Sequence, residues 1–167
     1  MDRVLRRGAT ILFAAAAAAY LVDRVTKLWA ERTLPGEPIG VIPNVLTLRF
    51  TTNSGGAFSL GGSAPWVFAT ATIVVSLLIV MTAFRHRSNL TAVALGLILG
   101  GALGNLTDRF VRGPGLSGRV IDFVDLHVWP IFNAADAAIV VGAILLGVSS
   151  IRAERSSPVR GIPGDDG

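Results

Sequence analysis

The chain contains no cysteine, only two histidines, and few charged residues for its length of 167 residues. Without a thiol it can form no disulfide, no thiolate metal site, no cysteine nucleophile and no cysteine-linked lipid anchor. Charged residues make up 16% of the chain, against about 25% in a typical soluble domain. Hydrophobic residues make up 51%. Since the apolar residues form runs separated by short polar segments, the composition is typical of a multi-pass membrane protein.

The basic surplus does not indicate a nucleic-acid partner. The chain carries 15 Lys and Arg against 11 Asp and Glu, and such an excess also occurs in nucleic-acid-binding proteins. Here, however, many arginines flank apolar runs, and no basic stripe with interleaved aromatic residues is present. The sequence also contains no Walker loop, dinucleotide fingerprint or HExxH motif. We therefore expect no nucleic acid, no organic cofactor and no metal.

Four apolar runs predict an all-α membrane protein with four transmembrane helices. The first has only 15 residues before Asp23 interrupts it, although it can continue to Ala30. A span needs about 20 residues, so a cleaved signal peptide is an alternative for this run; the three later runs argue against it. The four runs are Gly8–Val22, Ala64–Phe84, Leu90–Leu106 and Ile131–Ile151. In the third, Gly96, Gly100 and Gly104 are four residues apart, which predicts one face for close helix packing.

The distribution of arginines predicts the direction of the spans. Basic residues precede the first run, occupy the short Arg85–Arg87 connection and follow the fourth run. The positive-inside rule therefore places both termini in the cytoplasm and the segments 31–63 and about 109–130 outside. The alternating stretch Leu46–Thr51 and the turn Asn53–Gly56 predict a small extracytoplasmic β element. We expect one membrane-embedded domain over residues 1–155 and a disordered cytoplasmic tail over residues 156–167.

Polar residues gather at the outer ends of three of the predicted spans. Ionisable residues in or beside a span are costly, so they usually mark function. Spacings of three and four residues put several of them on common helix faces, and the loop before the fourth span adds two more carboxylates. The set comprises Asp23, Lys27, Asn105, Asp108, Arg109, Asp122, Asp125, Asn133 and Asp136.

Two close carboxylates could perform acid–base hydrolysis, because one can take a proton from water while the other supplies one. Asp136, inside an apolar run without an adjacent cation, is the strongest candidate. Spacing alone leaves Asp122 and Asp108 in competition for the second place. Asn53, in a glycine-rich turn, is a candidate for binding a substrate backbone.

Purely structural roles and other catalytic sets are also compatible with these polar residues. Asp108 with Arg109, and Asp23 with Lys27, are also compatible with simple ion pairs, and Asp125 with a solvated loop. His127 near Asp122 and Asp125 suggests a metal site, but no second histidine lies on that side. A serine–lysine dyad using Ser54 or Ser59 with Lys27 is conceivable, although no spacing supports it.

Five ordered sequence blocks resemble those of the lipoprotein signal peptidases (signal peptidase II). The resemblance implies a four-helix membrane bundle with an extracytoplasmic β-cradle, and an aspartic endopeptidase of the bacterial inner membrane. It implies removal of signal peptides from diacylglyceryl-modified prolipoproteins, with cleavage before the lipidated cysteine. It also implies contact with membrane lipid and inhibition by globomycin-type peptides. The blocks are Asp23–Lys27, Asn53–Phe58, Gly100–Arg109, Val120–Phe123 and Phe132–Asp136.

In that family's pattern the catalytic aspartates fall on Asp122 and Asp136. The family's supporting or substrate-binding positions fall on Asp23, Lys27, Asn53, Gly55, Asn105, Asp108, Arg109 and Asn133. Two other classes were weighed: a small proton-coupled transporter subunit with Asp136 as carrier, and a non-catalytic membrane scaffold. A carrier carboxylate normally lies near the middle of the bilayer, whereas this polar set lies at one face.

Overall fold

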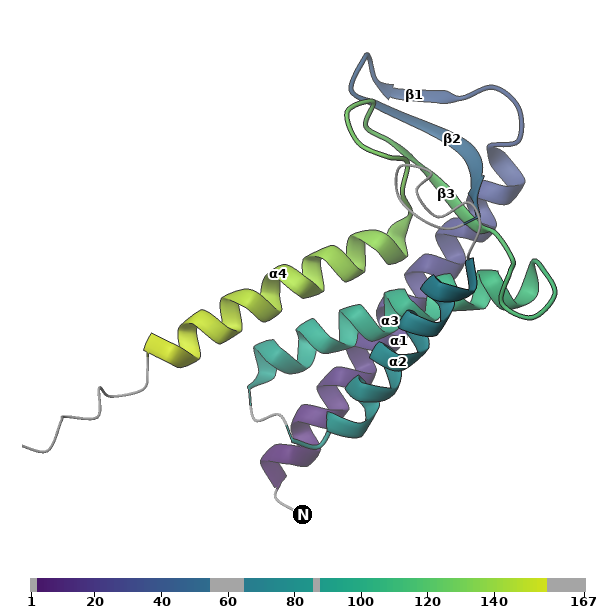
Figure 1. The fold of residues 1–167 in the computed structure, drawn as a ribbon. Helices are drawn as coiled ribbons and strands as arrows, with labels where there is room; N and C mark the ends of the chain where they lie inside the picture. The colour runs from purple at the N-terminus through teal and green to yellow at the C-terminus, as the bar shows by residue number, and fades with distance from the viewer. Residues whose placement is uncertain (1–2, 55–64, 86–87, 156–167) are drawn as a thin grey trace, which may run out of the picture.

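The computed structural model describes residues 3–54, 65–85 and 88–155. Within these ranges the chain forms four helices and a three-stranded antiparallel sheet at one end of the helices (Figure 1). The helices are α1 (Arg3–Thr33), α2 (Pro65–Thr82), α3 (Asn89–Val111) and α4 (Ala134–Arg155). The strands are β1 (Ile39–Ile42), β2 (Leu46–Asn53) and β3 (Val120–Asp125), in the order β1-β2-β3.

Helix α3 is the central element, and it packs against all three other helices. Its glycines permit this contact, as the sequence predicts. A Cβ at Gly96 or Gly100 would collide with a backbone oxygen of α1, and a Cβ at Gly104 would collide with the carboxylate of Asp23. A Cβ at Gly101 would collide with a backbone oxygen at the start of α4. Small residues thus bring α1 and α4 close to two different faces of α3.

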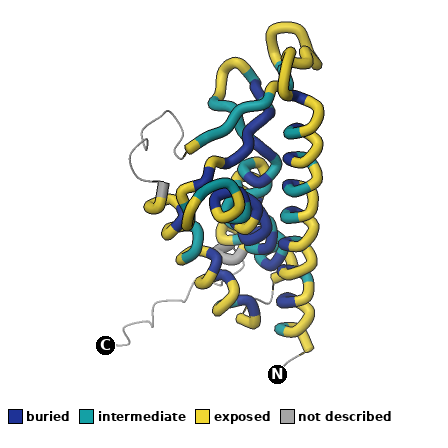
Figure 2. The backbone as a smooth tube through the Cα atoms, turned by 90° about the vertical axis from the view of Figure 1, so that its right-hand side faces the viewer, coloured by how far each residue is buried: buried dark blue, intermediate teal, exposed yellow. Residues whose placement is uncertain are grey.

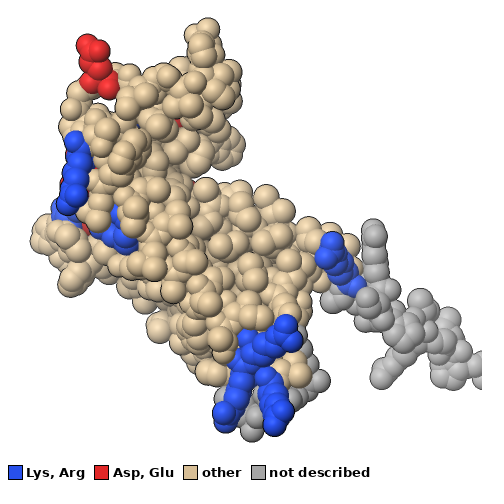
Figure 3. Space-filling view, turned by 180° about the vertical axis from the view of Figure 1, so that it is seen from behind, with Lys and Arg blue, Asp and Glu red and all other residues tan. Residues whose placement is uncertain are grey.

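The outer faces of the helices are apolar, as a lipid environment requires. Exposed residues run along the outside of the bundle and buried residues gather where helices meet (Figure 2). From behind, Lys and Arg lie towards two ends of the molecule, with a broad uncharged zone between them (Figure 3). Among the described residues, α1, α3 and the stretch 134–152 of α4 are long and apolar enough to cross a membrane. The apolar stretch of α2, Trp66–Thr82, is shorter.

The predicted helices exist, but the first residue of α4 differs from the prediction. Helix α1 is continuous over 31 residues and includes Asp23 and Lys27, which confirms that the first apolar run continues past Val22. Helix α4 begins at Ala134 and not at Ile131. The preceding segment is held in an extended form, because Phe132 pairs with Val124 through backbone hydrogen bonds.

The sheet lies at the end of the bundle away from the N-terminus (Figure 1). Strand β2 confirms the predicted strand, but β1 and β3 were not predicted, and Asp122 and Asp125 lie on β3 where a loop was expected. Most of β3 is buried on both faces, so its sequence does not alternate between apolar and polar residues. A small core joins this sheet to the end of α1. Its members are Ala30, Leu34, Ile121 and Phe123.

Candidate active site

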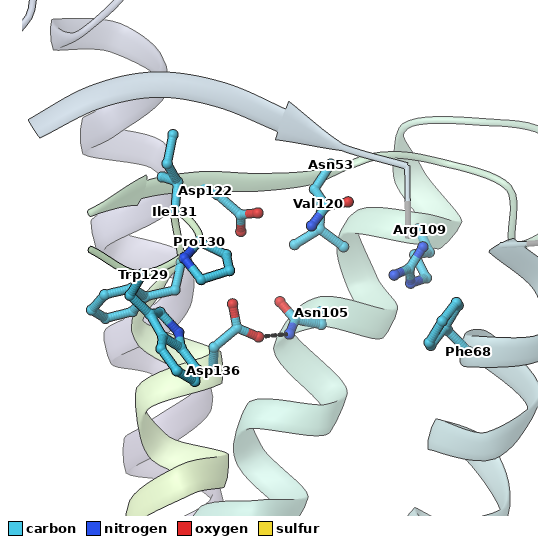
Figure 4. A pocket seen from close by; sticks show the side chains of 11 residues that line it. Asn53, Phe68, Asn105, Arg109, Val120, Asp122, Trp129, Pro130, Ile131 and Asp136 are labelled. Carbon is cyan, nitrogen blue, oxygen red and sulfur yellow. Dashed lines mark hydrogen bonds between the residues drawn. The ribbon is translucent and has the colours of Figure 1, made fainter. Parts of the chain in front are cut away.

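One cavity of about 290 Å³ lies between the sheet and the ends of the helices. Its polar lining combines Asn53 of β2, Asn105 and Arg109 of α3, Asp122 of β3 and Asp136 of α4. In Figure 4 the carboxylates of Asp122 and Asp136 point into the same space from above and below, and Arg109 lies across the cavity from them. The remaining lining residues are Phe68, Val120, Trp129, Pro130, Ile131 and Phe132.

Asp136 occupies the first turn of α4 and forms a reciprocal cap with Asn133, the residue before the helix. The backbone N–H of Asp136 donates to Asn133 Oδ1 at 3.0 Å, and the N–H of Asn133 donates to Asp136 Oδ2 at 3.3 Å. This arrangement is a capping box, which satisfies two N–H groups that the helix leaves free. Asn133 was expected inside the helix, but it lies immediately before the first helical residue, Ala134, and caps the helix. The cap fixes Asp136 at the mouth of the cavity.

Asp122 projects from the buried strand β3. Its Oδ1 accepts a 2.6 Å hydrogen bond from Asn133 Nδ2, and its side chain is 3% exposed. Burial raises the pKa of Asp122 to about 6, and the neighbouring Asp136 carboxylate acts in the same direction, while hydrogen bonds from Asn133 and Asn53 oppose the shift. Asp122 therefore retains a proton at pH values where an ordinary aspartate has lost it.

Two asparagines connect the carboxylates to one another. Asn105 Nδ2 donates to Asp136 Oδ1 at 2.8 Å, and Asn133 Nδ2 donates to both Asp122 and Asn105 Oδ1. The orientation of the Asn105 amide is fixed by Lys27, whose Nζ donates to Asn105 Oδ1 at 2.8 Å. An ammonium group can only donate, so the amide oxygen of Asn105 must face Lys27 and its N–H₂ must face Asp136.

Behind the cavity lies a second group of charges, which is closed to solvent. Lys27 Nζ lies 2.9 Å from Asp23 Oδ2 and 3.0 Å from Asp108 Oδ2, and all three side chains are fully buried. Arg24 and Arg112 both pair with Asp108 Oδ1, at 2.6 and 3.4 Å. With Glu31, which pairs with Arg112, the group has three anions and three cations, so the cost of burying its centre is largely offset by mutual attraction and hydrogen bonds.

An apolar groove of about 350 Å³ adjoins the cavity along the outer face of α4. Asp136 lines both spaces, so a chain lying in the groove would reach the carboxylates. The other groove residues are Leu126, Trp129, Phe132, Ala137, Val140 and Val141.

Comparison with known proteins decides between the possible interpretations of this site. A model of the family described as signal peptidase (SPase) II matches residues 15–152. The chain belongs to the signal peptidase II family. It is 42% identical over 143 residues to the lipoprotein signal peptidase of Rhodococcus jostii, covering 84% of this chain and 72% of that protein. It is 45% identical over 152 residues to that of Mycobacterium avium, covering 90% and 83%.

Solved structures agree with the family assignment. One bacterial membrane enzyme superposes with a TM-score of 0.77 at 26% identity, covering 90% of this chain and 93% of that one. Another superposes with a TM-score of 0.72 at 29% identity, covering 84% and 92%. Membership of the signal peptidase II family favours a membrane protease over a transporter subunit or a scaffold.

With the signal peptidase II family established, the predicted site residues divide into two groups. Asn53, Asn105, Arg109, Asp122 and Asp136 line the cavity, and Asn133 bridges them from below the surface. Asp23, Lys27 and Asp108 lie behind the cavity and do not line it. Gly55 lies outside the described residues.

The ion pairs of Asp108 differ from the pairing with Arg109 that the sequence suggests. Asp108 pairs with Lys27, Arg24 and Arg112, and not with Arg109. The reason is helix geometry: Arg109 faces the cavity, where its guanidinium lies 3.5 Å from the carbonyl oxygen of Ser54, whereas Asp108 faces α1. Asp23 and Lys27 do form an ion pair, in agreement with their spacing of four residues on α1.

Asp125 is not a solvated loop residue. It is 8% exposed, pairs with Arg49 at 2.8 Å and accepts a hydrogen bond from the His127 backbone. The ring of His127 contacts Thr47 Oγ1 at 2.9 Å, and in the described part of the chain no three His, Asp or Glu side chains cluster as metal ligands would.

Some residues of the site were missed in the sequence. Arg24, Glu31 and Arg112 lie at the partly exposed edge of the charge group, where Arg112 donates two hydrogen bonds to Glu31, at 2.7 and 3.0 Å. A signal was available, because Asp23, Lys27 and Glu31 are spaced by four and share one face of α1. Trp129 and Phe132 of the extended segment had no such signal.

Proposed function

We propose that this signal peptidase II family member is an aspartic endopeptidase in which Asp122 and Asp136 form the catalytic pair. Its substrates would be diacylglyceryl-modified prolipoproteins, cut just before the lipidated cysteine. The observation that carries the proposal is the surroundings of these two carboxylates. They come from different elements, open onto one cavity, and form no ion pair with any described residue.

The two aspartates would divide the acid and base roles. Asp122, with its pKa raised to about 6, is suited to hold the shared proton. Asp136 accepts hydrogen bonds from Asn105 and from the Asn133 backbone, which hold its carboxylate in place at the cavity. In this account Asp136 takes a proton from a water molecule, and the water oxygen attacks the scissile carbonyl carbon.

The rest of the reaction follows from that assignment. Asp122 donates its proton to the carbonyl oxygen as the tetrahedral intermediate forms, and Asp136 then passes its proton to the departing amide nitrogen. Asn53 and Arg109 line the same cavity and carry N–H groups that would hold the substrate backbone. No metal or organic cofactor is required for these steps.

The surroundings of the site support a lipid-attached substrate. The groove beside Asp136 is lined almost wholly by apolar side chains of α4 and the preceding segment. The apolar signal segment or the acyl chains of a prolipoprotein would fit such a surface, as would a globomycin-type peptide. Since the polar cavity and the apolar groove share Asp136, peptide and lipid would meet at the cleavage site.

The proposed membrane arrangement has four spans, with α2 as the shortest. Both termini would be cytoplasmic and the sheet and cavity would face outwards. The N-terminal end of α1 and the α2–α3 connection lie at the end away from the sheet (Figure 1), so a bilayer crossing the uncharged zone would separate them from the cavity. We propose a single peptidase domain over residues 1–155; the tail predicted for residues 156–167 lies outside the described residues.

The direct test is cleavage of a purified diacylglyceryl-prolipoprotein by detergent-solubilised wild type and by Asp136→Asn, followed by gel shift. We expect cleavage by wild type only. Cleavage by neither, with wild type folded, would refute the peptidase assignment. Equal cleavage by both would keep the peptidase and refute the catalytic pair.

A further inference from the structure

Asp23 holds the backbone next to Asp136. Its Oδ1 accepts a hydrogen bond from the N–H of Ala135 at 3.0 Å, and this bond is buried. Ala135 lies in the first turn of α4, where the helix leaves its N–H groups without internal partners. The carboxylate of a residue on α1 therefore fixes the position of the residue immediately before Asp136.

Asp108 makes the equivalent contact next to Asp122. Its Oδ2 accepts a hydrogen bond from the N–H of Ile121 at 3.3 Å, and this bond is buried as well. Ile121 immediately precedes Asp122 on β3. The two catalytic candidates, on a helix and on a strand, are thus each attached through the preceding residue to a buried aspartate.

A single ammonium group joins the two attachments. Lys27 Nζ lies 2.9 Å from Asp23 Oδ2, the oxygen that does not bind Ala135. It lies 3.0 Å from Asp108 Oδ2, the same oxygen that accepts the hydrogen bond from Ile121. Its remaining contact is the hydrogen bond to Asn105. Lys27 can only donate: one N–H is hydrogen-bonded to Asn105, and the ammonium group forms ion pairs with both carboxylates.

The group has little freedom to move. Asp23, Lys27 and Asp108 are fully buried, so separating any of them from its partners leaves an uncompensated charge without access to water. Gly104 lets α3 approach so closely that an added Cβ would collide with the carboxylate of Asp23. The position of these three residues is therefore fixed by the packing of α1 against α3, and not by the connections that lead into β3 and α4.

We propose that Asp23, Lys27 and Asp108 form a spacer that sets the separation of the two catalytic carboxylates. The spacer rests on the proposed function, and it makes these three positioning residues that do not touch the substrate. Asp23 and Asp108 each accept a hydrogen bond from the backbone N–H of the residue before one catalytic aspartate, and Lys27 fixes the distance between Asp23 and Asp108. Asp122 and Asp136 can then lie close together although both are acidic and neither has a paired cation.

The separation has a measurable consequence. Two neighbouring carboxylates release their protons in two steps whose apparent pKa values move apart as the groups approach. The charged groups around the pair are Lys27 on α1 and Arg109 and Asp108 on α3, while β2 contributes the uncharged Asn53. A wider separation should bring the two apparent pKa values of the pH–kcat profile together. General loss of stability would leave them unchanged.

The test uses the purified full chain in detergent with the prolipoprotein substrate. Asp23→Ala removes the acceptor of the Ala135 N–H hydrogen bond, whereas Asp23→Asn keeps an oxygen that can accept the same N–H. Leu12→Ala serves as the control for destabilisation, because Leu12 is fully buried in a separate core of α1, α2 and α3.

We expect Asp23→Ala to lower kcat by about 10- to 100-fold, as misplaced catalytic groups do, with KM within about twofold, since substrate contacts are kept. Its two apparent pKa values should approach each other by about half a unit or more. Asp23→Asn keeps an acceptor for Ala135 but turns its N–H₂ towards Lys27, so its kcat and pKa separation should lie between those of Asp23→Ala and wild type. Leu12→Ala should lower the melting temperature and leave both pKa values in place.

An unchanged pKa separation in Asp23→Ala, or a separation in Asp23→Asn no closer to wild type than that in Asp23→Ala, would overturn the spacer. Asp108→Ala and Asp108→Asn repeat the test at the other end, so the outcome does not depend on one variant folding. Asp136→Asn is assayed alongside. Full activity of Asp136→Asn would refute the proposed catalytic pair, whereas an inactive Asp136→Asn with unshifted Asp23→Ala would refute the spacer alone.

Discussion

The two pairs of aspartates at the sheet end of the bundle differ in the groups that surround them. Asp23 and Asp108 are fully buried, share Lys27, and bind backbone N–H groups. Asp122 and Asp136 line a cavity, and their side chains receive hydrogen bonds mainly from asparagines. An asparagine positions a carboxylate without supplying a full charge, so the second pair keeps the ability to exchange a proton.

Under the proposed function, this difference in partners accounts for the assignment of the chemistry to Asp122 and Asp136. A carboxylate that is buried in ion pairs with lysine or arginine is engaged by those partners and is not available to a substrate. A buried carboxylate beside another one, without a cation, has a raised pKa and can act as an acid. The cations thus decide which aspartates are structural and which are reactive.

The largest expected effect tests the reactive pair. Asp122→Asn and Asp136→Asn should each lower kcat by about 10²–10⁴-fold, because each removes a positioned acid or base. Asp125→Asn, on the same strand as Asp122 but paired with Arg49 away from the cavity, should stay within about twofold of wild type. Rates of prolipoprotein cleavage under saturating substrate measure this. A loss in Asp125→Asn equal to that in Asp122→Asn would contradict the assignment.

The structural pair should respond in stability. Lys27→Met leaves Asp23 and Asp108 facing each other in a buried site without their shared cation, which should cost about 3–5 kcal/mol of folding free energy. Arg49→Met, which breaks the half-exposed pair with Asp125, should cost less than about 1 kcal/mol. Unfolding of both variants in one detergent makes the comparison, and equal losses would show that burial of the Lys27 group carries no special weight.

The proton on Asp122 should appear as a pH dependence of stability. Its pKa is about 6 in the folded chain against 3.8 for an ordinary aspartate, so between these values the folded state binds more protons than the unfolded state. Stability from this group is complete below pH 3.8 and is lost as the pH rises through 6, by about 3 kcal/mol in all. The melting temperature of wild type should fall relative to Asp122→Asn over this range. Parallel curves would contradict the raised pKa.

The smallest effect concerns the close approach of α1 and α3. Gly104→Ala should destabilise the chain by about 1–3 kcal/mol, since the added methyl group would collide with the carboxylate of Asp23. Gly147→Ala, in α4, meets no atom within 4 Å and should be neutral or slightly stabilising. Thermal unfolding of the two variants distinguishes them. A neutral Gly104→Ala would mean that the helices can separate around Asp23 at no cost.

Much of the helical fold could be predicted from the sequence, because apolar runs and glycine spacing are local signals. The four helices, the glycine face of α3 and strand β2 follow from such patterns. Strand β3 could not be found in this way, because it is buried on both faces and lacks alternation. The start of α4 was misplaced because the partner that holds Phe132 extended is Val124, a contact between segments.

The site was predictable as a set of residues but not as an arrangement. Helical spacing brings Asp23 together with Lys27, and Asn105 with Arg109, on common faces. Spacing also puts Asp108 near Asn105, and only the packing of α3 against α1 turns Asp108 away from the cavity. The role of Arg112 depends on where α3 ends, which composition does not determine.

The most direct test of the two-pair account compares Asp122→Asn with Asp108→Asn in the same preparation, for kcat and for melting temperature. We predict that Asp122→Asn loses at least about 100-fold in kcat and keeps or raises its melting temperature at pH 7. Asp108→Asn should show a clearly lowered melting temperature and a smaller loss of kcat. The reverse result, with Asp122→Asn active and Asp108→Asn stable but inactive, would contradict the account and make Asp108 the catalytic partner of Asp136.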